Sequence, residues 1–159
     1  PAVICCNHSS FSDAIWVIVC SHQKRIFRTM AKKELFSHRV LGWFITKLGA
    51  FPVDREANDI HAVKTALGVL REGDKLLIFP EGTRVHGDAV VEPKSGVIHM
   101  AVRMHVPIVP VYIPRDKKIF HEVPTVIGEP YYPELGDHRD YARLARELME
   151  RIWALKPEE

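Results

Sequence analysis

The chain has 159 residues, of which 47% are hydrophobic and 26% charged, and its formal net charge is +2. This length suits one domain with a single buried core, and the composition is that of an ordinary globular protein. A net charge this small excludes a protein that binds nucleic acid through its overall charge. No apolar run approaches the ~18 residues that a membrane-spanning helix needs.

The N-terminal end predicts a corner between a strand and a helix. Residues 2–6 are an apolar, partly β-branched run, as expected of a buried strand, and Ser12 is a suitable cap for a helix that opens at Asp13. In a continuous helix His8 and Asp13 would lie about 140° apart around the axis. A strand–loop–helix corner can instead bring them together, so that Asp13 orients His8 as a general base. A capping hydrogen bond without any catalytic role is the alternative.

The cysteines offer a different nucleophile. The chain has three cysteines, and Cys5 and Cys6 are adjacent within the first predicted strand. This pattern predicts no disulfide framework and indicates a reducing compartment. Cysteines inside strands usually pack as inert side chains, so we favour His8 over either thiol.

A basic segment follows the first predicted helix. Residues 22–48 contain seven lysines and arginines and one glutamate, interleaved with large apolar side chains such as Phe36, Trp43 and Phe44. This mixture is typical of a surface that meets anionic lipid or a phosphorylated ligand. Two ordinary helices with solvated basic faces are the alternative.

The rest of the chain alternates strand-like and helix-like patterns. Strands are predicted at 2–6, 50–53, 75–79, 108–113 and 125–127, and helices at 60–70, 95–104 and 141–155. This alternation predicts a single α/β domain with a mainly parallel central sheet flanked by helices. Ligands of such sheets bind beyond the carboxyl ends of the strands.

Three loops are therefore expected at one edge of the sheet. The first contains His8 and Asp13, the second contains Arg55, and the third has the sequence Pro-Glu-Gly-Thr-Arg at positions 80–84. Two arginines near a base indicate an anionic substrate, because a guanidinium binds phosphate in a bidentate manner. Surface salt bridges are the alternative for each arginine. The predicted substrate-binding residues are Arg55, Glu81, Gly82, Thr83, Arg84 and Lys94.

Four segments in order resemble the motifs of the glycerolipid acyltransferases of the 1-acylglycerol-3-phosphate (lysophosphatidic acid) type. They lie between position 7 and about position 113: Asn7-His8-x-x-x-x-Asp13, Gly-Ala-Phe-Pro-Val-Asp-Arg at 49–55, Phe-Pro-Glu-Gly-Thr-Arg at 79–84 and Val-Pro-Ile-Val-Pro-Val at 106–111. Lys94 and Gly96 also fit the pattern between the third and fourth. The match departs after Arg84, where members commonly have Ser and this chain has Val85-His86.

The resemblance implies an acyl transfer in phospholipid biosynthesis. His8, oriented by Asp13, would deprotonate the hydroxyl of a lysophosphatidate-type acceptor, which attacks the thioester of acyl-CoA or acyl-carrier-protein. Arg55 and Arg84 would hold the acceptor's phosphate, with Glu81 and Gly82 shaping the loop. The resemblance implies no metal and no cofactor beyond this co-substrate. It also implies that residues 1–159 are a catalytic domain lacking an N-terminal membrane-binding part and working at the cytoplasmic face of a membrane.

Two other readings of the same residues stay open. A thioesterase or other hydrolase could use the same pair to activate water. A module that binds phospholipid without catalysis could use the basic segment instead.

Overall fold

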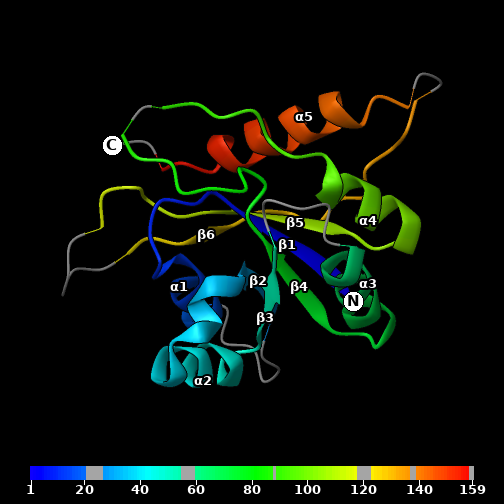
Figure 1. Ribbon diagram of the computed structural model, residues 1–159. Coiled ribbons are helices and arrows are strands. Elements are labelled where there is room, and N and C mark those ends of the chain that lie inside the picture. The colour runs from blue at the N-terminus through cyan, green and yellow to red at the C-terminus, as the bar shows by residue number, and fades with distance from the viewer. Residues whose placement is uncertain (21–26, 55–59, 88, 118–122, 137–138, 158–159) are drawn as a thin grey trace.

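The structure is a computed structural model that describes the chain apart from residues 21–26, 55–59, 88, 118–122, 137–138 and 158–159 (Figure 1). A six-stranded sheet has the order β3-β2-β4-β1-β5-β6. Its neighbouring strands are parallel, except for the antiparallel pair β5–β6. The strands are β1 (Ala2–Cys6), β2 (Arg28–Lys32), β3 (Ala50–Val53), β4 (Lys75–Ile78), β5 (Ile108–Tyr112) and β6 (Val126–Ile127). The predicted α/β fold with a mainly parallel sheet is confirmed.

Helices cover both faces of this sheet. In Figure 1, α4 and α5 lie above the sheet and α1 lies below it. The helices are α1 (Asp13–Cys20), the short 3-10 helix η1 (Lys33–Ser37), α2 (Arg39–Lys47), α3 (Ile60–Arg71), α4 (Gly96–Met104) and α5 (Tyr141–Ala154). None of the helices that the structure describes is long and apolar enough to cross a membrane.

The central strand β1 supplies two hydrophobic cores. Val3 and Cys5 pack into the core formed with α3, α4 and α5, while Ile4 and Cys6 pack into the core that contains Val17 of α1. Successive side chains of a strand point to opposite faces. Because both faces are covered, the run is apolar throughout rather than alternating.

The basic segment contains a strand, β2, where the sequence pattern predicted none. β2 lies between β3 and β4, and only Thr29 of its five residues is buried. The Thr29 hydroxyl donates a hydrogen bond to the backbone carbonyl of Leu77 at 3.1 Å. Pairing with neighbours on both sides therefore makes this polar sequence a strand. The other strands end within one or two residues of the predicted limits, as assignments usually do.

The loops that carry the predicted site residues leave the same edge of the sheet. β1, β3, β4 and β5 run parallel, so their carboxyl ends share this edge. The ends of β1 and β4 are adjacent, whereas β3 lies three positions from β1 in the strand order. At about 4.8 Å per strand, that is a separation of roughly 14 Å.

Candidate functional site

The corner after β1 brings His8 and Asp13 into contact. Nδ1 of His8 lies 2.9 Å from Oδ2 of Asp13, and the two side chains are 10% and 0% exposed. The same Oδ2 accepts the backbone N–H groups of Ser9 at 2.6 Å and Ser10 at 2.8 Å. α1 begins at Asp13, as predicted. With Nδ1–H donating to the carboxylate, Nε2 is the ring nitrogen left to accept a proton.

Asp13 is held in its ionised form. Burial by itself raises the pKa of Asp13, but hydrogen bonds from His8, from Lys117 and from two loop N–H groups outweigh it and lower the pKa below its usual value. Nζ of Lys117 lies 2.7 Å from Oδ1, the carboxylate oxygen that His8 does not contact. A carboxylate this deeply buried keeps its charge only because cationic and N–H groups surround it.

The loop after β4 fixes His8 from the other side. The imidazole ring stacks on Phe79, with ring centroids 4.1 Å apart and an angle of 21° between the planes. The His8 backbone N–H donates to Oε2 of Glu81 at 2.5 Å, and the His8 carbonyl accepts from the N–H of Val85 at 2.8 Å. The first and third predicted loops are therefore interlocked.

Glu81 uses both carboxylate oxygens within the protein. Oε2 accepts from His8, and Oε1 accepts from Nη2 of Arg115 at 3.1 Å. Only 3% of Glu81 is exposed. Burial raises the pKa of Glu81, although the hydrogen bond from the His8 N–H and the charge of Arg115 act in the opposite direction. These contacts give Glu81 a structural role toward His8, and its contact with substrate stays a prediction.

The remaining residues of the third loop face outward. Gly82 has φ +66°, which favours glycine, and an added Cβ would lie 2.8 Å from Cε of Lys94. Lys94 is tied to this loop because its N–H donates to the carbonyl of Pro80 at 2.8 Å. Thr83 and Arg84 are exposed, and the guanidinium of Arg84 lies 3.8 Å from the centre of the Phe11 ring. Gly82, Thr83, Arg84 and Lys94 thus form one rim beside His8.

Arg55 lies outside the described residues. The strand that precedes it, β3, ends at Val53, and the next residue, Asp54, forms an ion pair with Lys33 of η1. The role predicted for Arg55 stays a prediction.

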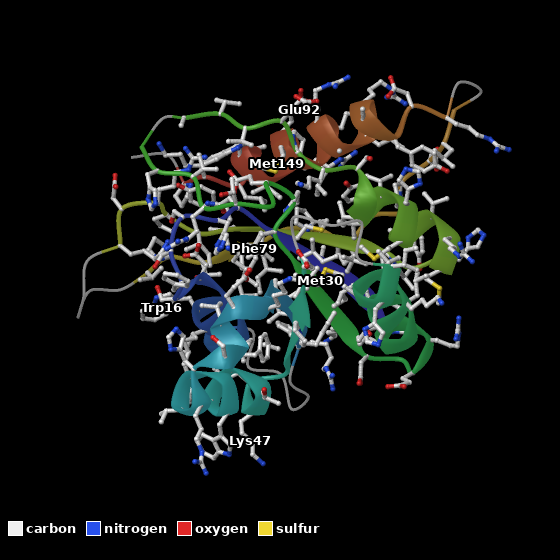
Figure 2. All side chains as sticks on the ribbon, in the orientation of Figure 1. Trp16, Met30, Lys47, Phe79, Glu92 and Met149 are labelled. Atoms are coloured by element: carbon white, nitrogen blue, oxygen red, sulfur yellow. The ribbon has the colours of Figure 1, made fainter. Side chains whose placement is uncertain are left out.

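A largely apolar pocket of about 750 Å³ adjoins this rim. Gly82 and Lys94 of the rim line the pocket, and so does Phe79, which stacks on His8. Figure 2 shows Phe79 and Met30 near the centre of the molecule, between the helices on the two sides of the sheet. The apolar lining residues are Met30, Val53, Ile60, Ala62, Val63, Ile78, Phe79, Pro80, Pro93, Val97 and Met100. A pocket of this kind can hold a hydrocarbon chain.

The two strand cysteines are packing residues. Cys5 and Cys6 are fully buried, and burial raises the pKa of both thiols well above the usual value. A thiolate, not a thiol, is the nucleophile in cysteine chemistry. Their environment therefore disfavours the thiol alternative.

Three further residues of this edge carry contacts that the sequence analysis did not predict. The Asn7 amide donates to the carbonyl of Ile113 at 2.7 Å and accepts from its N–H at 2.9 Å, which extends the pairing of β1 with β5. Arg115 and Lys117 follow β5 and reach Glu81 and Asp13. Their position directly after a predicted strand is the signal that could have found them.

Comparisons with known proteins identify the family of this chain. The profile of the acyltransferase family, described as "Acyltransferase", matches residues 1–114. The 1-acyl-sn-glycerol-3-phosphate acyltransferase of Bacillus subtilis is 36% identical over 163 residues, covering 97% of this chain and 80% of the relative. That of Streptococcus pneumoniae is 36% identical over 110 residues, covering 69% of this chain and 40% of the relative.

A solved structure shares the fold. The crystal structure of the 1-acyl-sn-glycerophosphate (LPA) acyltransferase PlsC from Thermotoga maritima matches with a TM-score of 0.72 and 25% identity, covering 99% of this chain and 67% of that one. The family match spans the interlocked His8 and Glu81 loops as well as Lys94. The chain therefore belongs to the acyltransferase family and is an acyltransferase related to the 1-acyl-sn-glycerol-3-phosphate acyltransferases.

Proposed function

We propose that this chain transfers an acyl group from acyl-CoA or acyl-carrier-protein to the free hydroxyl of a lysophosphatidate-type acceptor, with His8 as the general base. The observation that carries the proposal is the buried His8–Asp13 pair at 2.9 Å beside an apolar pocket. The reaction needs no metal or other cofactor.

The proposed step is a direct attack without an acyl-enzyme. Nε2 of His8 takes the proton of the acceptor hydroxyl while its oxygen forms a bond to the thioester carbonyl carbon. The resulting tetrahedral intermediate collapses as its C–S bond breaks, and the proton on Nε2 passes to the departing thiolate. Asp13 stabilises the imidazolium between these two events.

In this proposal the rim binds the acceptor's phosphate and the pocket binds an acyl chain. Arg84 and Lys94 supply cations for the acceptor's phosphate, and Thr83 provides a hydroxyl donor next to them. The N–H of Gly82 donates to the carbonyl of Phe79 at 3.0 Å, so Gly82 shapes the loop instead of binding the phosphate. Arg55 completes this set in the proposal. The apolar pocket takes an acyl chain, because each buried CH₂ group contributes about 0.8 kcal/mol.

The proposed site of action is the cytoplasmic face of a membrane, with α2 as the contact surface. This helix buries only Gly42, whose added Cβ would lie 2.8 Å from the carbonyl oxygen of Phe36 in η1. Its large apolar side chains point outward instead: Val40 is 80% exposed, Trp43 64% and Phe44 46%. Apolar side chains with basic neighbours suit the boundary between lipid headgroups and acyl chains.

The basic residues around α2 support an anionic membrane as the partner. Arg39 and Lys47 lie at the two ends of the helix, which contains no acidic residue. Figure 2 shows Lys47 at the outer end of α2, pointing away from the body of the protein. Interfacial helices combine these features.

The acyl-transfer proposal is tested by His8→Ala. We expect acceptor-dependent thiol release from acyl-CoA to fall at least ~100-fold, because a general base contributes about 10²–10⁴ in rate. His61→Ala, an exposed histidine of α3, is the matched control and keeps full activity. Unchanged turnover in a folded His8→Ala protein would contradict the proposal.

The same assay separates transfer from hydrolysis. A transferase releases thiol in proportion to added lysophosphatidate and makes the diacylated product. A thioesterase releases free fatty acid at the same rate with and without acceptor. Omitting the acceptor therefore decides between the two reactions.

Phosphate recognition is tested by Arg84→Ala. We expect the KM for lysophosphatidate to rise about 10-fold or more, since a hydrogen bond to a charged group is worth about 1.5–3 kcal/mol. A monoacylglycerol, which lacks the phosphate, serves as the second acceptor. The KM of the variant for this acceptor should change little. Equal losses with both acceptors would count against phosphate binding by Arg84, and Arg71→Ala on the exposed end of α3 is the control.

A further inference from the structure

We infer that Lys117 is a positioning residue of the acyl-transfer site: its ammonium group fixes Asp13, and its positive charge offsets part of the charge of the carboxylate that His8 contacts. This inference rests on the proposed role of His8 as the general base. Lys117 belongs to none of the four motif-like segments and follows the last of them by six residues.

Three protein oxygen atoms surround the ammonium group of Lys117. Nζ lies 2.7 Å from Oδ1 of Asp13 and donates to Oγ of Ser9 at 2.8 Å and to the carbonyl of Pro114 at 2.7 Å. The contact with Asp13 is an ion pair, and the contacts with Ser9 and Pro114 are hydrogen bonds. The side chain is 9% exposed. Lys117 therefore acts on the site through Asp13 and Ser9 rather than by touching a substrate.

The two oxygens of Asp13 are divided between its partners. Oδ2 accepts from His8 and from the loop N–H groups, and Oδ1 faces Lys117. One contact arrives from the loop after β1 and the other from the loop after β5. Asp13 is thereby held by two loops that are distant in the sequence: Lys117 follows Asp13 by 104 positions.

The charges around this pair point to Lys117 as the cation that tunes it. Cys6 faces Asp13 from β1, and burial raises the pKa of its thiol, which leaves it neutral. Glu81 faces His8 from the loop after β4, but its carboxylate is paired with Arg115. The charge of Lys117 is by contrast applied directly to the carboxylate that His8 contacts.

The electrostatic consequence has a definite sign. A bare carboxylate next to an imidazole favours the protonated ring, which cannot act as a base. Lys117 offsets part of the Asp13 charge and so weakens this effect on His8. The Asp13 carboxylate stays ionised and oriented toward His8.

The experiment removes the charge and retains a hydrogen-bond donor. In Lys117→Gln we expect the titration midpoint of the His8 ring, followed by NMR of the substrate-free protein, to rise by at least about half a pH unit. The acid limb of the kcat profile should move by the same amount, and the KM for both substrates should stay constant. Lys117→Arg keeps the charge, so its midpoint should stay within about 0.2 units even if the altered shape lowers kcat.

Two results would overturn the inference. One is a folded Lys117→Gln protein whose His8 midpoint does not move, which would leave Lys117 with a structural role only. The other is a shift of the His8 midpoint by half a pH unit or more in Lys117→Arg. If Lys117→Gln does not fold, the Lys117→Arg measurement alone tests the inference. Lys64→Gln, an exposed lysine of α3, controls for the loss of one charge. Because the titration needs no substrate, a shifted midpoint without acyl transfer would contradict the proposed reaction and not the electrostatic role.

Discussion

Asp13 shows how a single buried residue can combine stability with orientation. Its carboxylate is completely buried and binds His8, Lys117 and two backbone N–H groups. Removing one partner of a buried ion pair costs about 3–5 kcal/mol, because the other charge is left without compensation. Asp13 is therefore expected to stabilise the fold of the corner as well as to serve the reaction.

We predict that Asp13→Asn lowers the free energy of unfolding by about 3 kcal/mol at pH 7. The lowered pKa of Asp13 sets the pH dependence. A carboxyl whose pKa is lower in the folded state stabilises above its unfolded pKa of about 3.9, and this stabilisation is lost as pH falls through the folded value. The difference in the free energy of unfolding between the wild type and Asp13→Asn should therefore shrink as the pH falls from 4 to 3. Urea titrations at several pH values measure it.

Two neighbouring carboxylates make this measurement specific. Glu81 has a raised pKa, so its stabilisation is present below its unfolded pKa and is lost as pH rises through the folded one. This contribution is the same in both proteins and cancels in the difference. Asp116→Asn, at an exposed neighbour of Lys117, controls for the loss of one carboxylate. A constant loss from pH 7 to pH 3 in Asp13→Asn would contradict the electrostatic explanation.

At the scale of elements, α2 inverts the usual pattern of a surface helix. Its small residue, Gly42, faces η1, and Val40, Trp43 and Phe44 face outward. We predict that Trp43→Ser combined with Phe44→Ser weakens binding to anionic vesicles at least about 10-fold, since burying one large apolar side chain is worth about 1.5–3 kcal/mol. Vesicle co-sedimentation measures this.

The control for α2 is another exposed apolar residue. Ile127 of the edge strand β6 is 51% exposed, and Ile127→Ser should bind vesicles as the wild type does. If both variants bind equally well, α2 is not the contact. The thermal melting temperature of each variant shows whether the fold is retained.

Elements with a strong local pattern could be predicted from the sequence. The run at 2–6 is buried on both faces, and the stripe in α5 buries Leu144, Leu148 and Ile152. β2 could not be predicted, because only Thr29 is buried and the strand depends on pairing with β3 and β4. Local patterns report burial, and β2 is specified by its neighbours instead.

The candidate site was predictable only in part for a related reason. The strand-end rule brought His8, Asp13 and the 80–84 loop to one edge, and the structure places them together. It gave no direction for each side chain, so the contacts of the Glu81 carboxylate with His8 and Arg115 could not be predicted. The contact of Glu81 with substrate stays a prediction. Lys117 is 104 positions from Asp13 in the sequence, and only the folded sheet brings them together.

At the scale of the whole molecule, charge is distributed unevenly while the net charge is small. Residues 22–48 have a charge of +6. Because the net charge of the chain is +2, the remaining residues together have a charge of −4. The basic segment contains α2 and its exposed apolar side chains. Such an asymmetry orients a protein toward an anionic surface, because the two parts respond to the surface potential with opposite signs.

We therefore predict that binding to anionic vesicles depends on salt in a way that separates charge from apolar insertion. Each basic residue near an anionic surface contributes about 1 kcal/mol, and the Debye length falls from about 10 Å at 0.1 M salt to about 3 Å at 1 M. Wild-type binding should weaken at least about 10-fold over this range.

Arg39→Gln with Lys47→Gln should bind weakly at low salt and lose little more affinity as salt is added. The variant with both α2 serine substitutions should keep the salt dependence at a lower affinity throughout. Binding that is equally strong at both salt concentrations, or to uncharged vesicles, would rule out electrostatic docking. His8→Ala should bind as the wild type, because the His8 side chain is only 10% exposed and lies outside α2.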